Sequence, residues 1–188
     1  SLLKPGRLDE IYLELCSLHC FDIIAVSESH LCNTIPDTDI AIPNYNVFRR
    51  DRNRQGGGVL LYIHSRFTCI RRTDLECPTL ELLWAEIKLR NHSLLVGVSY
   101  RPPNQTAQEI ELFIEGLYDS LDSITGSLNQ SIVLLGDFND RCVNWDSDHR
   151  DSEVGLKLVN LVASTNLFQL VTTPTRNNNL LDLLITDS

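Results

Sequence analysis

The sequence predicts a single α/β domain in which helices cover a mixed β-sheet. Its 188 residues are enough to bury one sizeable core. Hydrophobic residues make up 43% and charged residues 22%, which is typical of a globular protein. Short apolar runs of strand length alternate irregularly with longer segments of helical periodicity. No apolar run approaches the length that a membrane span needs, so no membrane partner is expected.

The first half of the chain contributes one helix and three strands. Apolar residues recur at helical spacing over 8–18, which predicts an amphipathic helix after Pro5. The run at 23–26 is too short for a helix and predicts a buried strand. A further strand is expected at 45–48. Three glycines then lead into the apolar strand expected at 59–63.

The second half alternates strands with two longer helices. Leu83, Ala85 and Ile87 alternate in a way that would place them on one sheet face. Apolar positions between Gln105 and Ile124 repeat at helical spacing and predict a long helix. The other expected elements are strands at 81–89, 94–100, 132–135 and 180–186, and a helix at about 152–164.

Charge is unevenly distributed along the chain. The net charge of −9 argues against a surface built entirely to hold nucleic acid. Between Arg49 and Arg72, however, seven arginines meet one acid, a local balance of +6. A basic stripe on an acidic body suits a site where carboxylates hold a cation and arginines meet phosphate. The alternative is a solvated arginine loop without a ligand.

The six cysteines form no CxxC pair, and no second ligand pair at zinc-like spacing follows Cys16, His19 and Cys20. A zinc site is therefore disfavoured. We interpret the cysteines as reduced and mostly buried, as expected in an intracellular protein.

Polar residues stand where strongly apolar runs stop. Glu28, Tyr100, Asp137, Asn139 and Asp182 each lie in or at the end of such a run. A buried acid costs several kcal/mol unless it is paired, hydrogen-bonded or bound to metal. Four strands that each deliver a polar group predict a common site, provided that the strand ends converge.

The segment Asp137-Phe138-Asn139 is the most informative. In extended backbone Asp137 and Asn139 point the same way while Phe138 points into the core. A carboxylate beside an amide suits a site that orients water and donates to a phosphate oxygen. Gly136 would let the backbone approach a ligand closely. The competing interpretation is a turn capped by Asp and Asn.

Two other enzyme classes are disfavoured. The triple glycine at 56–58 is followed by neither Gly-Lys-Ser/Thr nor a helix, so it is no P-loop. The chain lacks Gly-x-Ser-x-Gly, and none of its five histidines has a setting that selects it for a catalytic triad.

Together the motifs resemble the endonuclease/exonuclease/phosphatase superfamily, and most closely the endonuclease domain of non-LTR retrotransposons. They are Ser27-Glu28-Ser29-His30-Leu31, Arg49-Arg50-Asp51-Arg52 before the triple glycine, Tyr100-Arg101-Pro102-Pro103, Leu135-Gly136-Asp137-Phe138-Asn139 with Trp145 beyond, and Leu181-Asp182-Leu183. The resemblance implies a four-layer, deoxyribonuclease-I-like sandwich of two mixed β-sheets flanked by helices.

The resemblance also implies a mechanism. Glu28 would be the main Mg²⁺ ligand, with Mn²⁺ as a substitute, and Asp182 would lie near metal or phosphate. Tyr100 would hydrogen-bond the scissile phosphate, Asp137 would orient or deprotonate the attacking water, and Asn139 would steady the charge on phosphorus. The expected DNA contacts are Arg49, Arg50, Arg52, Arg54 and Arg101.

The superfamily has an Asn near its N-terminus and a Ser-Asp-His motif on a late strand, and neither lies among residues 1–188. We therefore expect a single but incomplete domain that is nearly inactive by itself. The expected partners are DNA and a reverse transcriptase domain in the same natural chain. A monomeric, intracellular and nuclear protein is anticipated.

Two alternatives share this fold. A phosphatase acting on inositol phosphates would carry a Trp-Cys-Asp-Arg segment near the last strands, whereas this chain has Pro174-Thr175-Arg176 followed by asparagines. A domesticated binding module without activity is disfavoured by the retention of Glu28 and the other polar site residues. Both remain alternatives to the Mg²⁺-dependent DNA endonuclease.

Overall fold

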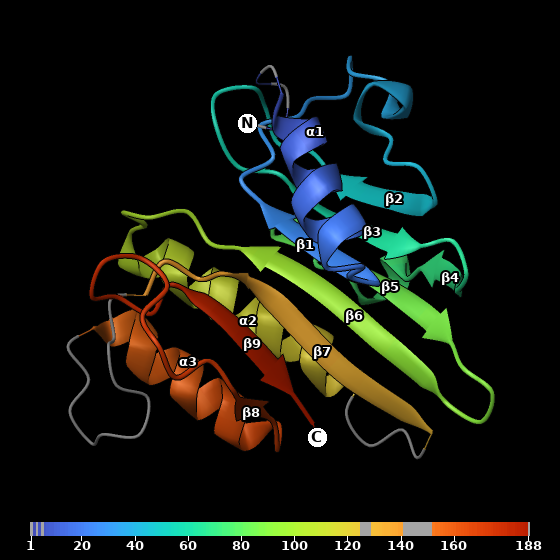
Figure 1. The fold of residues 1–188 in the computed structure, drawn as a ribbon. Coiled ribbons are helices and arrows are strands. Elements are labelled where there is room, and N and C mark those ends of the chain that lie inside the picture. The colour runs from blue at the N-terminus through green and yellow to red at the C-terminus, as the bar shows by residue number, and fades with distance from the viewer. Residues whose placement is uncertain (1, 3, 5, 125–128, 141–151, 188) are drawn as a thin grey trace.

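The computed structural model describes residues 2, 4, 6–124, 129–140 and 152–187. Two β-sheets pack face to face, and helices cover their outer faces (Figure 1). This arrangement confirms the expected four-layer sandwich. Trp145 and Cys142, which belong to the sequence-based predictions, lie outside the described residues.

The smaller sheet has the strand order β1-β3-β2. It consists of β1 (Ile23–Ser27), β3 (Val59–His64) and β2 (Tyr45–Arg50). Both pairings are antiparallel, with Ile23 opposite Ile63 and Arg50 opposite Val59. The central strand β3 is apolar as far as its last residue, His64, and almost entirely buried, as expected for a strand covered on both faces.

The larger sheet has the strand order β4-β5-β6-β7-β9-β8. It is mixed, because β6 and β7 run parallel while the other pairs are antiparallel. A parallel pair needs a crossover, and α2 supplies it. The strands are β4 (Thr68–Arg71), β5 (Glu81–Lys88), β6 (Ser93–Tyr100), β7 (Gln130–Asp137), β8 (Phe168–Gln169) and β9 (Asp182–Thr186).

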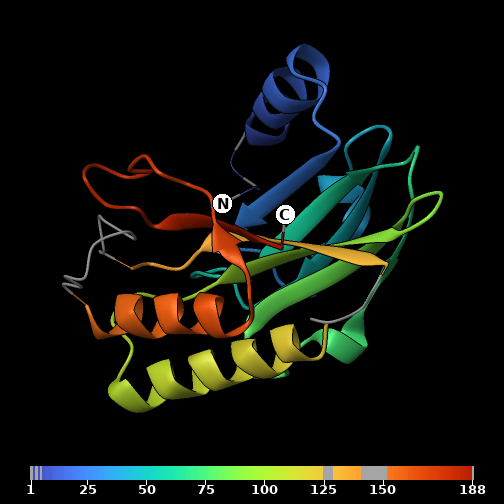
Figure 2. The ribbon, with the colours of Figure 1, turned by 90° about the horizontal axis from the view of Figure 1, so that it is seen from below.

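Two helices lie side by side on the outer face of the larger sheet, α2 (Ala107–Asp122) and α3 (Glu153–Ser164) (Figure 2). A capping box between Thr106 and Glu109 begins α2, and the Ser152 hydroxyl caps α3 by accepting from Gly155 N. On the opposite side of the molecule lie α1 (Arg7–Ile11) and the π-helical η1 (Tyr12–Leu18). The short 3₁₀ turns η2 (Asp37–Ile40) and η3 (Thr73–Leu75) occur in connections.

Each interface between layers has its own apolar cluster. The cluster between the sheets includes Leu61, Val98 and, as expected, Leu83, Ala85 and Ile87. A second cluster joins α2 and α3 to the larger sheet, and a third packs the 31–42 segment and the N-terminal helix on the smaller sheet. Three separate clusters confirm the layered fold.

Three local predictions needed revision. The helix expected over 8–18 begins as an α-helix but continues as a π-helix, which is rare and is not signalled by apolar spacing. The edge strands β4 and β8 were missed because each is very short and has exposed positions. The five described cysteines are free but not buried, contrary to expectation, since Cys20 is exposed and the others are only partly covered.

Among the described residues, none of the helices is both long enough and apolar enough to cross a lipid bilayer.

Phe138 should be essential for stability. Its side chain is fully buried and meets Phe113 edge-on, with ring centroids 6.2 Å apart. Phe138→Ala should lower the free energy of unfolding by about 3–5 kcal/mol through the cavity it leaves. Phe168→Ala is the matched control, because that residue is 60% exposed. Urea denaturation of both variants would test this, and equal losses would show that Phe138 is not a core residue.

Candidate active site

Four polar side chains form one row across the larger sheet. Glu81 pairs with Tyr100, Tyr100 with Asp137, and Asp137 with Asp182, across the strands β5, β6, β7 and β9. Directly paired residues of neighbouring strands lie on the same face of the sheet. The strand ends therefore converge, and the row lies at one end of the face that looks toward the smaller sheet.

Glu28 reaches this row from the smaller sheet. It follows β1 directly and has a left-handed backbone, with φ of 54°. The Tyr100 hydroxyl donates to Glu28 Oε1 over 2.5 Å, so one hydrogen bond joins the two sheets at the site. Burial and the Glu28 carboxylate raise the pKa of Tyr100 above its usual range. The Tyr100 hydroxyl, which was expected to donate to a phosphate, thus donates to Glu28 in this structure.

The Asp137–Asn139 segment is a turn as well as part of the site. Strand β7 ends at Asp137, and Asn139 is left-handed with φ of 48°, so the extended backbone does not continue as predicted. Asp137 Oδ1 accepts from Asn139 N over 2.9 Å, as in the competing capped-turn interpretation. Phe138 points into the core, as expected.

Asp137 lies among like charges. Only 2% of the residue is exposed, and this burial raises the pKa of its carboxyl group. The charges of Asp182 and Glu28 raise the pKa further, whereas the Asn139 N–H and the charge of Arg176 lower it. Three carboxylates from three strand ends are therefore close enough to interact electrostatically.

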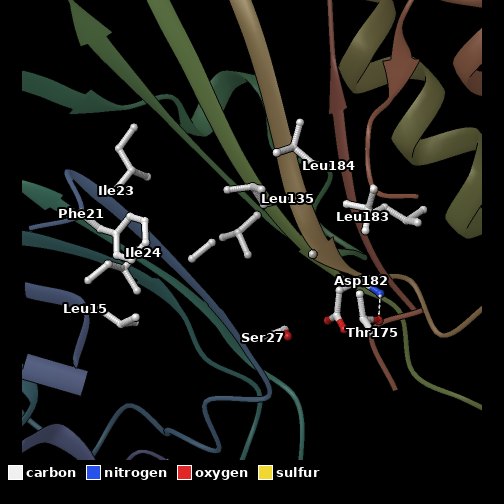
Figure 3. A pocket seen from close by; sticks show the side chains of 14 residues that line it. Leu15, Phe21, Ile23, Ile24, Ser27, Leu135, Thr175, Asp182, Leu183 and Leu184 are labelled. Atoms are coloured by element: carbon white, nitrogen blue, oxygen red, sulfur yellow. Dashed lines mark hydrogen bonds between the residues drawn. The ribbon is translucent and has the colours of Figure 1, made fainter. Parts of the chain in front are cut away.

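Thr175 organises the beginning of β9. Its Oγ1 accepts from the backbone N–H of Asp182 over 3.1 Å (Figure 3), and it also accepts from the N–H of Leu181 over 3.1 Å. Asp182, Thr175 and Ser27 lie at the polar end of a cavity of about 400 Å³ between β1 and the strands β7 and β9. The remaining walls are mostly apolar, so a charged ligand would fit only at the polar end.

Gly136 serves strand packing. A Cβ atom at this position would lie 1.9 Å from the carbonyl oxygen of Ser99 on β6. Any larger residue would therefore push β7 away from β6, and with it Asp137 away from Tyr100. The close approach predicted for Gly136 is to a neighbouring strand, and no contact with a ligand is needed to explain it.

Arg101 fixes the Asp137–Asn139 turn by hydrogen bonds to its backbone. Its Nε donates to Phe138 O over 2.6 Å and its Nη2 to Asn139 O over 2.7 Å, while Asn139 Nδ2 donates back to Arg101 O over 2.7 Å. Nη1 contacts Gln105 Oε1 at 3.0 Å, and only 4% of the residue is exposed. Because these bonds occupy the Arg101 guanidinium within the protein, they argue against the predicted contact of Arg101 with DNA.

The arginine stripe is largely neutralised by the fold. Six of the seven arginines between Arg49 and Arg72 form ion pairs, mostly with acids outside that window. Arg49 pairs with Asp37 at 3.1 Å, and Arg50 with Glu76 at 3.5 Å. In the described part of the chain, only Arg54 of the seven lacks a carboxylate partner. The 49–72 segment as a whole is therefore neither a basic surface free to meet phosphate nor a solvated arginine loop.

Sequence reasoning missed Glu81, Thr175 and Arg176. Glu81 begins β5 in register with Tyr100, and its alternation with apolar residues was the available signal. Arg176 is exposed, and it carries no ion pair within the ranges that the structure describes. Its effect on Asp137 depends on the path of the 171–181 segment, which no local pattern predicts.

The carboxylates fit a hard divalent cation. In the described ranges no group of three His, Cys, Asp or Glu side chains lies close enough to enclose a metal ion. Mg²⁺ needs no such group, because one or two carboxylates with waters and substrate phosphates commonly hold it. Glu28, Asp137 and Asp182 supply oxygen donors and excess negative charge, so the donor set suits this ion.

The sequence of residues 94–188 matches the family model described as endonuclease-reverse transcriptase. No curated protein sequence matches the chain. Among solved structures, the endonuclease domain of TRAS1, a telomere-specific non-LTR retrotransposon, superposes with a TM-score of 0.72 and 16% identity, covering 97% of this chain and 80% of that one. These findings confirm the resemblance to the endonuclease/exonuclease/phosphatase superfamily.

Two further structures share the fold. One is the Neisseria 3′ phosphatase NExo bound to a product DNA hairpin, with a TM-score of 0.64 and 13% identity over 99% of this chain and 82% of that one. The other is a Bacteroides thetaiotaomicron mannosyl-6-phosphatase, with a TM-score of 0.64 and 14% identity over 96% of this chain and 76% of that one. At such identities the likeness shows the fold alone.

Removing the Arg101 guanidinium should destabilise the domain. Arg101→Met keeps the side-chain length but removes the donor to the buried Phe138 carbonyl and to the partly buried Asn139 carbonyl. The free energy of unfolding should fall by about 2–4 kcal/mol, because each lost partner costs about 1–3 kcal/mol. Arg90→Met, at an exposed position, is the control. Similar urea midpoints for Arg101→Met and the parent would contradict this assignment.

Proposed function

Because the chain belongs to the endonuclease-reverse transcriptase family, we propose that it is the divalent-metal-dependent endonuclease part of a retrotransposon protein and nicks DNA. One observation supports this above the others. Tyr100, Asp137 and Asp182 lie in one cross-strand row, and Glu28 joins them from the other sheet through a 2.5 Å hydrogen bond. Such a group suits phosphodiester hydrolysis by water.

Each residue has a proposed role. Asp137, whose pKa is raised by burial, accepts a proton from the attacking water and orients it. Its Oδ1 is fixed by Asn139 N, so the other oxygen is directed at the water. Asn139 has a second amide hydrogen besides the one given to Arg101 O, and donates it to a phosphate oxygen. With Glu28 in the role of a cation ligand, the Tyr100 hydroxyl would be available to donate to the phosphate.

Glu28 and Asp182 are the proposed ligands of Mg²⁺, with Mn²⁺ as a substitute. When bound, the cation supplies charge neutralisation on the phosphate oxygens and the leaving group. The Glu28 carboxylate is held in place by Tyr100. Thr175 fixes the backbone from which Asp182 extends, because its Oγ1 accepts from the N–H groups of Leu181 and Asp182.

The proposed DNA contacts are the arginines that the fold leaves available. Arg54 and Arg176 carry no ion pair in the portion of the chain described here, and Arg176 acts electrostatically on Asp137. Arg52 is partly exposed beside Tyr100 although Glu81 pairs with it. Arg49, Arg50 and Arg101 support the structure around them instead of binding phosphate.

Further residues outside this stretch are proposed to complete the site. By the resemblance, these are an upstream Asn and a downstream Ser-Asp-His, followed by the reverse transcriptase domain of the same chain. DNA cleavage is therefore best measured in the full-length protein, whose proposed location is the nucleus.

In the full-length protein, Asp137→Asn should abolish most nicking of supercoiled plasmid. The amide oxygen still accepts from Asn139 N, but the group no longer accepts the proton of water. A fall of about 10²–10⁴-fold is expected, the usual contribution of a general base. Removing divalent metal with a chelator should stop the parent as well. Asp119→Asn, on the outer helix α2, should leave the rate unchanged.

Full nicking by Asp137→Asn would refute the proposed mechanism. A phosphate monoester should be tested beside the plasmid, because the fold also occurs in phosphatases. Rapid hydrolysis of the monoester with an intact plasmid would favour the phosphatase alternative, and inactivity on both substrates would favour the binding module.

Arg176→Ala should weaken binding to duplex DNA without changing sequence preference. The slope of log K against log salt should become shallower by about one unit, the effect of losing one phosphate contact. Arg90→Ala removes the same charge from the β5–β6 hairpin, at the other end of these strands from Tyr100, and should leave the slope unchanged. Fluorescence anisotropy between about 50 and 200 mM salt measures both. Superimposable titrations of Arg176→Ala and the parent would exclude the contact.

A further inference from the structure

The triple glycine at 56–58 leaves room for an ion pair. Gly57 and Gly58 have left-handed backbones, with φ of 70° and 82°. A Cβ atom on Gly57 would lie 2.5 Å from both Arg52 Cζ and Glu81 Oε2, and one on Gly58 would lie 2.5 Å from Ser29 Oγ. Both conformation and space therefore require glycine, and the space holds Arg52 and Glu81.

Glu81 uses both carboxylate oxygens to join the two sheets. Oε1 accepts from Arg52 Nη1 over 2.8 Å, and Oε2 accepts from the backbone N–H of Gly58. Arg52 Nε in turn donates to Gly56 O over 2.9 Å. Glu81 belongs to β5 of the larger sheet, whereas its partners lie in the connection between β2 and β3 of the smaller one. Only 14% of the Glu81 side chain is exposed, compared with 37% of the Arg52 side chain.

The same glycines hold the segment that carries Glu28. Ser29 N donates to Gly58 O over 3.0 Å, and His30 N donates to Gly57 O over 2.9 Å. A continuous path therefore runs from Glu81 through Gly58 to Ser29, the residue next to Glu28. Glu81 also stands in register with Tyr100, and Arg52 lies over the Tyr100 ring at 5.8 Å from its centroid. Glu81 and its ion-pair partner Arg52 are thus connected to both residues of the Tyr100–Glu28 hydrogen bond.

We propose that Glu81 is a positioning residue of the site: through Gly58 and Ser29 it fixes the position from which Glu28 would hold a cation. Arg52 is its counter-ion and neutralises a carboxylate that would otherwise repel Glu28. The proposal rests on the proposed function, since it takes Glu28 as a cation ligand. Groups that orient a metal ligand typically change metal affinity by about 10–100-fold when removed.

The competing view is that Glu81 and Arg52 form a salt bridge that only stabilises the fold. The same strand offers a matched pair for comparison, because Glu86 binds Arg72 at 3.0 Å and is likewise nearly buried. Glu86 lies toward the far end of β5, opposite Leu95 of β6 and not opposite Tyr100. A purely structural role would make the two glutamates equivalent.

The test measures Mn²⁺ affinity by electron paramagnetic resonance on the chain as it stands. Glu81→Met keeps the side-chain length but cannot accept hydrogen bonds, and should weaken binding by about 10–100-fold. Glu81→Gln, whose amide oxygen still accepts from Gly58 N, should recover most of the loss. Glu86→Gln should bind Mn²⁺ like the parent, and Glu28→Gln should lose binding.

The outcomes separate the two proposals. Parent-like binding by Glu81→Met, together with loss in Glu28→Gln, overturns the positioning role and leaves the cation site standing. Parent-like binding by Glu28→Gln refutes the cation site itself. A second measurement needs no variant: Mg²⁺ should slow amide exchange at Gly58 and Ser29 but not at Gly97, because coupling between sites is reciprocal. Unchanged exchange at Gly58 in Mg²⁺-loaded protein overturns the inference.

Discussion

The site depends on the register of four neighbouring strands. The pairings of Glu81, Tyr100, Asp137 and Asp182 place their side chains at one end and on one face of the larger sheet. A slip by a single residue in any strand would turn its side chain to the opposite face. The apolar residues of each strand resist such a slip, because they would leave the core at the same time. Packing energy thus fixes the position of groups that contribute little to packing themselves.

Gathering carboxylates at a partly buried place is unfavourable, and the surrounding structure offsets it in several ways. Asp137 accepts a backbone N–H, Glu28 accepts the Tyr100 hydroxyl, and Glu81 is paired with Arg52. What remains is the mutual repulsion of Glu28, Asp137 and Asp182, which adds to the effect of burial in raising the pKa of Asp137. A bound divalent cation would relieve this repulsion, which is why the proposed function and the electrostatics agree.

Much of the fold could be predicted because its signals are local. The apolar run at 59–63, the helical period after Gln105 and the strand before Asp137 each reflect a buried surface that any solution must cover. The partners of the arginines could not be predicted in this way. Arg49 meets Asp37 and Arg101 meets the 138–139 carbonyls only because the chain returns there. The left-handed turn at Asn139 was open to two interpretations for the same reason.

Glu28 and Asn139 share a backbone conformation that ordinary side chains seldom adopt, with φ of 54° and 48°. For Glu28 this conformation costs on the order of 1 kcal/mol, whereas asparagine tolerates it better. A glycine in place of Glu28 would remove that strain and a share of the repulsion, while removing the carboxylate. Selection for stability alone would therefore favour a more stable protein that lacks the carboxylate of the site. An acid at position 28 is therefore a compromise between stability and chemistry.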